Sequence, residues 1–229
     1  IWYTRFNQLN ESEDIKMDIL ETMKARHSVR QYKNQAIESS KREKINALIK
    51  DVNAESKLSI QVFYDEPKCF DSFMAHYGKF ENVKNYIAIV GNKNDQEKAG
   101  YYGEKIVLKC QKLGLNTCWV AMTHGKSKAQ IKRGQKLLII ISLGYGETQG
   151  VPHKSKSIAE LGQADQKNEW FEKGMEAVSL APTAVNQQKF YFELKNGIVT
   201  AKNLGGFYSR IDLGIVKYHF EAVTGHEVK

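Results

Sequence analysis

The sequence has few cysteines, few prolines and no long apolar run. Only three of its 229 residues are cysteines and no two form a C-x-x-C pair, so neither a disulfide framework nor a zinc site is indicated. Reduced thiols are typical of the cytoplasm, where we expect the protein to reside. The longest apolar run, residues 137–141, is far shorter than the roughly 20 residues of a membrane-spanning helix, so we expect no membrane span.

The first residues are mixed and polar, without the apolar centre of a secretory signal. We expect residues 1–14 to form an irregular arm.

Charge of one sign is not concentrated anywhere, although the net charge is +8. Lysines are spread along the chain without a basic block or an interleaved aromatic ladder, which disfavours nucleic-acid binding; that class of partner would show salt-sensitive retention on DNA. A small anionic ligand such as a phosphate ester suits this charge better.

Signatures of direct protein catalysis are also missing. The six histidines show no i, i+4 pairing and no G-x-S-x-G segment occurs, so we expect neither a metal site nor a hydrolase nucleophile. An enzyme with this sequence would have no catalytic side chain of its own and would rely on a cofactor for its chemistry.

Apolar periodicity predicts alternating groups of helices and strands. Ser39 or Ser40 is expected to cap the second helix, and Asn196-Gly197 is typical of a tight hairpin turn. The predicted helices are 15–25, 39–52, 68–77, 96–113, 167–180 and 207–224, and the predicted strands are 58–64, 83–90, 115–120, 135–143, 189–194 and 198–202.

The order helix, loop, strand, strand, helix occurs twice, over residues 39–113 and 167–224. Gly103 precedes Gly114 by the interval that separates Gly214 from Gly225, which favours an internal repeat. We therefore expect one α+β domain over residues 15–229, with a first half of about 15–162 and a second half of about 163–229.

Three segments have the composition of a site for a planar anionic ligand. Residues 26–30 (RHSVR) combine two guanidinium groups, an imidazole and a hydroxyl, which suit a phosphate. Residues 181–188 (APTAVNQQ) are small or carry amides, so the backbone can approach a flat ring closely. Residues 144–156 form a glycine-rich basic loop after the most apolar strand. Each also has a purely structural interpretation: a cationic helix end, a connecting loop and a solvated loop.

The same segments resemble the FMN-dependent nitroreductase family. Residues 26–30 resemble its R-x-S-x-R/K signature, and residues 181–188 its A-P-S-x-x-N-x-Q segment. Residues 114–120 resemble its G-L-G-x-x-W-I stretch, residues 143–146 its L-G-Y-P loop, and residues 212–221 its D-x-G-I…H-x-E helix. The resemblance covers roughly residues 15–224.

The resemblance implies a site for FMN, with NAD(P)H as electron donor. Four basic residues would contact the phosphate and the ribityl chain: Arg26, Arg30, Lys154 and Lys156. His27 and Ser28 would border the phosphate and the pyrimidine side. The isoalloxazine would be covered by Pro182, Thr183, Ala184 and Asn186 and approached by Trp119 and Val120. Tyr77 and Lys79 fall in the region where family members contact the pyrimidine edge.

One departure points to the internally duplicated "putative TM nitroreductase" branch. Ordinary members are dimers with FMN at the interface, and they carry the A-P-S-x-x-N-x-Q segment in the region of residues 53–60. Here that region lacks the motif and the good copy lies in the second half. The resemblance thus implies a fused pseudo-dimer, monomeric in solution, that has kept one of two flavin sites.

The implied activity is ping-pong hydride transfer from NAD(P)H to a small organic acceptor such as a nitroaromatic or a quinone, with FMN carrying the chemistry. The alternative is a flavin-binding protein of the same fold with a different redox reaction or little turnover.

Overall fold

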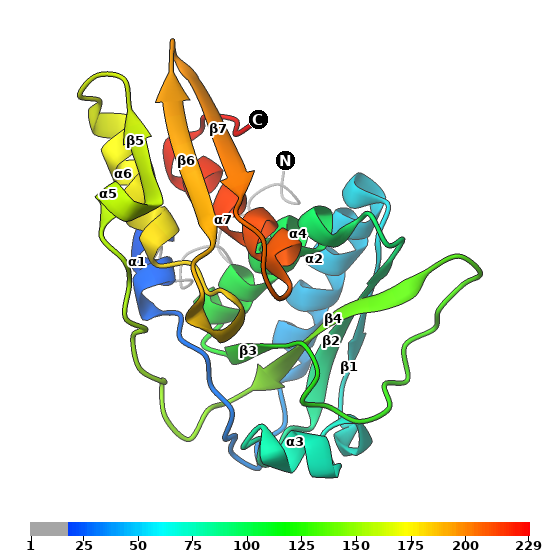
Figure 1. The fold of residues 1–229 in the computed structure, drawn as a ribbon. Coiled ribbons are helices and arrows are strands. Elements are labelled where there is room, and N and C mark those ends of the chain that lie inside the picture. The colour runs from blue at the N-terminus through cyan, green and yellow to red at the C-terminus, as the bar shows by residue number, and fades with distance from the viewer. Residues whose placement is uncertain (1–17) are drawn as a thin grey trace, which may run out of the picture.

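The computed structural model describes residues 18–229, and the expected arm of residues 1–14 lies outside this range. The chain forms an α+β fold with two sheets, and two long helices lie between them (Figure 1). Within the described range no helix is both long enough and apolar enough to cross a membrane.

The first part of the chain builds the larger sheet, whose strand order is β1-β2-β4-β3 with every pair antiparallel. Its elements in chain order are α1 (Ile19–Ala25), α2 (Ser39–Ser56), β1 (Ser59–Phe63), η1 (Pro67–Cys69), α3 (Phe73–Tyr77), β2 (Asn85–Gly91), α4 (Gln96–Lys112), β3 (Asn116–Val120) and β4 (Lys136–Gly144).

The second part builds the smaller sheet, in which β5 pairs parallel to β6 and β6 pairs antiparallel to β7. Its elements in chain order are α5 (Ile158–Leu161), β5 (Gly162–Ala164), α6 (Glu169–Ser179), η2 (Ala184–Asn186), β6 (Phe190–Lys195), β7 (Ile198–Asn203) and α7 (Ser209–Thr224).

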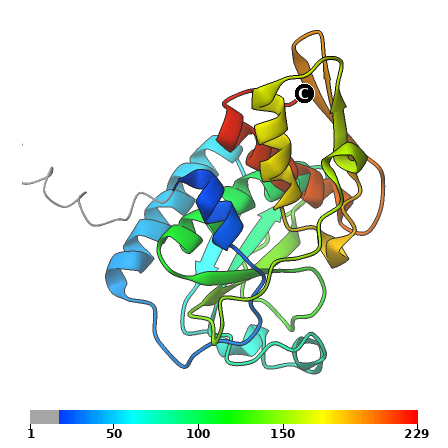
Figure 2. The ribbon, with the colours of Figure 1, turned by 90° about the vertical axis from the view of Figure 1, so that its left-hand side faces the viewer.

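The larger sheet is covered on both faces, as the apolar composition of its strands predicts. Ile87 and Ile89 of β2 belong to the main core beneath α2 and α4, whereas Tyr86 and Ala88 belong to a second cluster that includes residues of α3 and of the chain after α1. Side chains alternate between faces along a strand, so this strand contributes to both cores. Figure 2 shows α1 lying beside the helices of this layer.

Helices α4 and α7 cross at unusually close range through two glycines. A Cβ atom on Gly100 would lie 1.9 Å from the carbonyl oxygen of Ile211, and a Cβ atom on Gly214 would lie 1.9 Å from that of Glu97. The contact is reciprocal, because the same sequence offset relates Gly100 to Gly214 and Glu97 to Ile211. Any larger residue at either glycine would force the helices apart.

The predicted helices and strands are largely confirmed within residues 18–229, with the following differences. The N-cap of α2 is Glu38, without a side-chain capping bond, so the expected role of Ser39 or Ser40 is wrong. The predicted helix at 68–77 is two separate turns, η1 and α3. Residues 158–164 form α5 and β5, which are too short for a periodic signal, although the Ser157–Glu160 capping box marks where α5 begins. The reciprocal contact uses Gly100 rather than Gly103, whose spacing suggested a repeat.

The helix crossing generates a stability prediction. Replacing Gly100 with alanine should lower the free energy of unfolding by about 2 to 3 kcal/mol, because the added methyl group meets backbone that cannot rotate away. Urea denaturation measures the change, with Lys50→Ala on the exposed face of α2 as a near-neutral control. A gain of about 1 kcal/mol, as helix propensity alone predicts, would contradict the proposed tight contact.

Candidate functional site

Two adjoining cavities lie between the first and second halves of the chain and form the candidate site. The larger, the apolar cavity, has a volume of about 390 Å³. The smaller, the basic cavity, has a volume of about 320 Å³. The cavities adjoin because they share part of their walls, namely Ser28, Arg30, Pro182, Thr183 and Val185.

The remaining walls differ in chemistry. The apolar cavity is completed mainly by apolar side chains, with one carboxylate: Gly78, Cys118, Trp119, Ala121, Met122, Thr123, Ile139, Ala184, Phe207, Tyr208, Ile211, Asp212 and Ile215. The basic cavity is completed by Arg26, His27, Val151, Pro152, His153 and Asn186. The arrangement suits a ligand with a flat apolar part joined to an anion.

The RHSVR segment reaches the site as an extended chain beside β3. The amide of Val29 donates to the carbonyl of Thr117 at 3.0 Å, and Ser28 forms a parallel bridge with Thr117. Alternate side chains of an extended segment share a face. Arg26, Ser28 and Arg30 therefore all line the cavities, while Val29 is buried in the core.

The APTAVNQQ segment is held in a conformation that is uncommon for residues other than glycine. Val185, Asn186 and Gln188 have φ values of 46°, 54° and 46°. Asp212, in the first turn of α7, holds the segment by accepting from the amide of Ala184 at 3.0 Å and from Nε2 of Gln187 at 2.8 Å. Such conformations persist where neighbouring bonds impose them, and they are frequent at binding sites.

A second set of hydrogen bonds ties this segment to the basic loop. Nδ2 of Asn186 and Nε2 of Gln188 both donate to the carbonyl of Lys154, at 2.9 and 3.0 Å. Oε1 of Gln188 accepts from the amide of Lys156 at 2.8 Å. Gln188, only 5% exposed, thereby fixes the two segments relative to each other.

Below the site, a buried carboxylate joins four elements. Glu104 of α4 is fully buried and accepts from Nε1 of Trp119 at 3.0 Å. Its other oxygen lies 3.0 Å from Nε2 of His219 in α7 and 3.9 Å from Nε of Arg26. Burial favours the neutral acid, but His219, Arg26 and Trp119 outweigh that effect and hold the pKa of Glu104 below its usual value. Glu104 thus holds Trp119 by a hydrogen bond and lies beside the guanidinium of Arg26 as its counter-charge.

Arg26 is the main electrostatic feature of the basic cavity. Its side chain is 3% exposed, and its Nε and Nη1 have no hydrogen-bond partner among the described residues. Burial lowers the pKa of Arg26 and the charge of Glu104 opposes this shift; an arginine stays protonated in either case. Because Arg26 and Arg30 both line this cavity, its geometry favours an anion there.

The two histidines of this cavity add little positive charge. Burial lowers the pKa of His27, and the neighbouring Arg26 lowers it further. Burial also lowers the pKa of His153, with Arg26 contributing in the same direction. At neutral pH the positive charge in the basic cavity therefore comes from Arg26 and Arg30, which suit a phosphate group.

The structure brings together nine of the fourteen residues that the sequence suggested for the site. Those nine line the cavities: Arg26, His27, Ser28, Arg30, Trp119, Pro182, Thr183, Ala184 and Asn186.

The other five lie outside the cavity walls. Tyr77 is 73% exposed, and Gly78 beside it lines the apolar cavity instead of Tyr77 or Lys79. Val120 is 1% exposed within the second core cluster. Lys154 and Lys156 adjoin the site through the backbone bonds to Asn186 and Gln188, and their direct contact with a ligand stays a prediction.

Sequence reasoning missed several residues of the site. Asp212 stood in a recognised segment, but nothing in the sequence showed that it would bind the APTAVNQQ backbone. Phe207 and Tyr208 belong to the start of a predicted helix, whereas they lie before α7 and line the apolar cavity. Glu104 is an acidic residue in an amphipathic helix, which without a structure indicates a solvated position.

No group of three or more potential metal ligands occurs among residues 18–229.

Residues 18–224 match the model of the family described as "Putative TM nitroreductase". Comparison with curated proteins gives no match.

Two solved structures are informative about the fold. A "putative nitroreductase" from Thermotoga maritima is 24% identical over 90% of this chain and 83% of that chain, with a TM-score of 0.67. A "putative nitroreductase in complex with fmn" from Desulfovibrio desulfuricans is 15% identical over 63% of this chain and 95% of that chain, with a TM-score of 0.50. These similarities confirm the expected fold. Because the family model spans nearly all described residues, the chain belongs to the "Putative TM nitroreductase" family.

Proposed function

We propose that the chain binds one FMN in the two joined cavities and acts as a flavin-dependent oxidoreductase. The observation that carries this proposal is the pair of adjoining cavities, one lined by Arg26 and Arg30 and the other mainly by apolar side chains. Family membership and the FMN complex of the Desulfovibrio desulfuricans protein support the same cofactor.

The residues present fit the parts of FMN. Arg26 and Arg30 would hold the phosphate, with Ser28 between them on the same face of the extended segment. Trp119, Pro182 and Ala184 would border the ring system in the apolar cavity. The ring of Trp119 is fixed from below by Glu104 and by Gly103, where a Cβ atom would lie 2.4 Å from the indole.

FMN, when bound, supplies the capacity to accept and donate a hydride, so the protein needs no catalytic side chain of its own. The chain's own part is to bind and orient the cofactor and to exclude water from the ring. Arg30 lines both cavities and contributes positive charge near the ring, which favours an electron-rich ligand. NAD(P)H is the proposed electron donor, and a small nitroaromatic or quinone-like molecule is the proposed acceptor.

One flavin per chain is expected because the two halves differ at the position of Asp212, which holds the segment proposed to border the flavin ring. The offset that relates Gly100 to Gly214 places Lys98 where the second half has Asp212. Nζ of Lys98 donates to the carbonyl of Ser56, whereas Asp212 accepts from the amide of Ala184. We propose that the halves form a fused pseudo-dimer in which this reversed polarity accompanies the loss of the second site.

Asp212 also makes the free energy of unfolding depend on pH. Its side chain is 4% exposed, and burial raises its pKa to about 6, while the bonds from Ala184 and Gln187 oppose the rise. Because the folded-state pKa lies above the unfolded value, the folded protein binds this proton more tightly. The resulting contribution to stability is full at low pH and is lost as the pH rises towards and through about 6.

The assignment of Arg26 to the FMN phosphate generates a prediction about flavin affinity. Arg26→Gln should weaken FMN binding roughly 50-fold, because charge-assisted hydrogen bonds are lost, while binding of riboflavin, which has no phosphate, should change little. Fluorescence titration of the apoprotein with both flavins measures the two affinities. Lys173→Gln, at an exposed side chain of α6 outside both cavities, is the control and should change FMN affinity less than about threefold.

If the Arg26→Gln variant loses FMN and riboflavin affinity equally, Arg26 does not contact the phosphate. FMN-loaded wild-type protein should lose its visible absorbance on anaerobic mixing with NADPH or NADH; stable absorbance would contradict the proposed donor.

The raised pKa of Asp212 generates a prediction about stability. Between about pH 5 and about pH 7.5 the contribution of Asp212 to the free energy of unfolding should fall by about 1 kcal/mol, a fall that Asp212→Asn should abolish. Urea denaturation of apoprotein and variant at both pH values measures this difference, and all other titrating groups cancel in the comparison. An unchanged stability difference between the two proteins would refute the raised pKa.

A further inference from the structure

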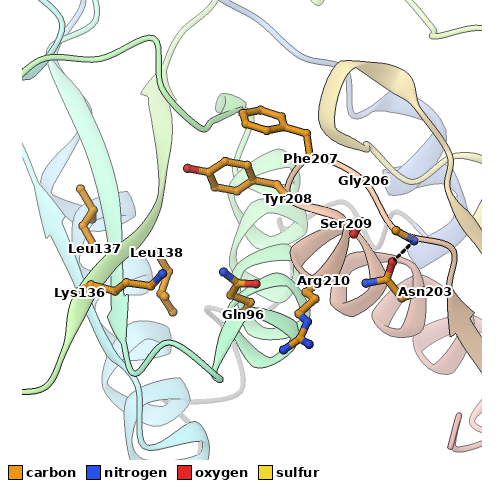
Figure 3. A pocket seen from close by; sticks show the side chains of 11 residues that line it. Gln96, Lys136, Leu137, Leu138, Asn203, Gly206, Phe207, Tyr208, Ser209 and Arg210 are labelled. Atoms are coloured by element: carbon orange, nitrogen blue, oxygen red, sulfur yellow. Dashed lines mark hydrogen bonds between the residues drawn. The ribbon is translucent and has the colours of Figure 1, made fainter.

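A second, more polar cleft of about 810 Å³ adjoins the apolar cavity (Figure 3). The two spaces share Phe207 and Tyr208, the last residues before α7. The cleft is bounded on one side by the start of β4 and on the other by the loop between β7 and α7. A ligand that occupies both spaces would have to pass these two aromatic rings.

Tyr208 forms the partition between the two spaces. Its hydroxyl donates to the carbonyl of Ala121, just after β3, at 3.4 Å. Its φ of 55° is uncommon for a residue with a side chain, and it follows Gly205 and Gly206, whose φ values are 80° and 133°. The loop between β7 and α7 is also held by the APTAVNQQ segment, because Nε2 of Gln187 donates to the carbonyl of Phe207 at 2.6 Å.

The charge of the polar cleft favours an anion. Lys136 of β4 and Arg210 of α7 face it from opposite sides, and neither forms an ion pair with any residue in the described range 18–229 (Figure 3). No aspartate or glutamate is among the described residues that line it. Gln96 and Ser209, the first residues of α4 and α7, also line the cleft, so the positive ends of two long helices add to the potential.

The exposure of the cations distinguishes this cleft from the basic cavity. Arg26 is almost fully buried and suits the phosphate of a resident cofactor, whereas Lys136 and Arg210 are exposed and suit an anion that binds and leaves. Exposed charges also act at long range and attract a charged ligand before contact.

We propose that the polar cleft binds the phosphate-bearing part of a pyridine dinucleotide while the dihydronicotinamide ring enters the apolar cavity. The proposal rests on the flavin oxidoreductase function proposed above and adds the site of its electron donor. The donor matches the geometry because it combines a planar ring with an anionic tail, and the apolar cavity and the polar cleft lie side by side across Phe207 and Tyr208.

The test separates the tail of the donor from its reactive ring. In the variant Lys136→Glu/Arg210→Glu the cleft becomes acidic, and in the control Lys50→Glu/Lys173→Glu the same change of net charge occurs on exposed helix surfaces elsewhere. The first readout is calorimetric binding of ADP-ribose, which has the diphosphate tail and no nicotinamide, to FMN-loaded protein. The cleft variant should bind ADP-ribose at least roughly tenfold more weakly than the control variant does.

The second readout is anaerobic flavin reduction by NADPH and by 1-benzyl-1,4-dihydronicotinamide, a donor without phosphate. The cleft variant should need roughly tenfold more NADPH for half-maximal reduction rate, with an unchanged response to the benzyl donor and unchanged FMN content. Equal losses with both donors, equal losses in the control variant, or no loss at all would overturn the proposal. If wild-type protein retains FMN but neither donor bleaches it, the proposed oxidoreductase function fails instead.

Discussion

The closeness of α4 and α7 is the constraint on which the rest of the structure depends. Each helix covers one sheet, and only the glycines at their crossing let the two layers approach to backbone contact. The crossing places Glu104 of one helix and Asp212 of the other beneath the same pair of cavities. The site is therefore a product of how the halves pack, and neither half contains it alone.

The two buried carboxylates, Glu104 and Asp212, each hold part of the site in place, but their pKa values shift in opposite directions. Glu104 has His219, Arg26 and Trp119 around it, so its charge is stabilised and its pKa lies below the usual value. Asp212 has only the neutral donors of Ala184 and Gln187, so burial dominates and its pKa rises. Glu104 holds the indole and lies beside the guanidinium as its counter-charge, and Asp212 holds the strained APTAVNQQ turn, which together define the two ends of the candidate flavin site.

The sequence was sufficient for most of the secondary structure and for two of the segments that line the cavities, because both leave local signals. Period-two spacing puts Arg26, Ser28 and Arg30 on one face, and small residues mark the turn after α6. Residues whose role comes from tertiary packing could not be found: Glu104 looks like any acidic residue of an amphipathic helix, and Tyr208 reaches the site only because α7 begins later than periodicity indicates. Likewise Val120 has a suitable place in the sequence but belongs to the opposite face of β3 from Trp119.

The most direct test of the central claim is the number of FMN molecules that remain bound per chain after the purified protein is mixed with excess FMN and desalted. The visible absorbance of the flavin against protein concentration gives this ratio. The account predicts one FMN per chain, held between the RHSVR and APTAVNQQ segments. Retention of two would show that the first half has kept its own site despite Lys98, and no retention by folded protein would contradict the flavin site itself.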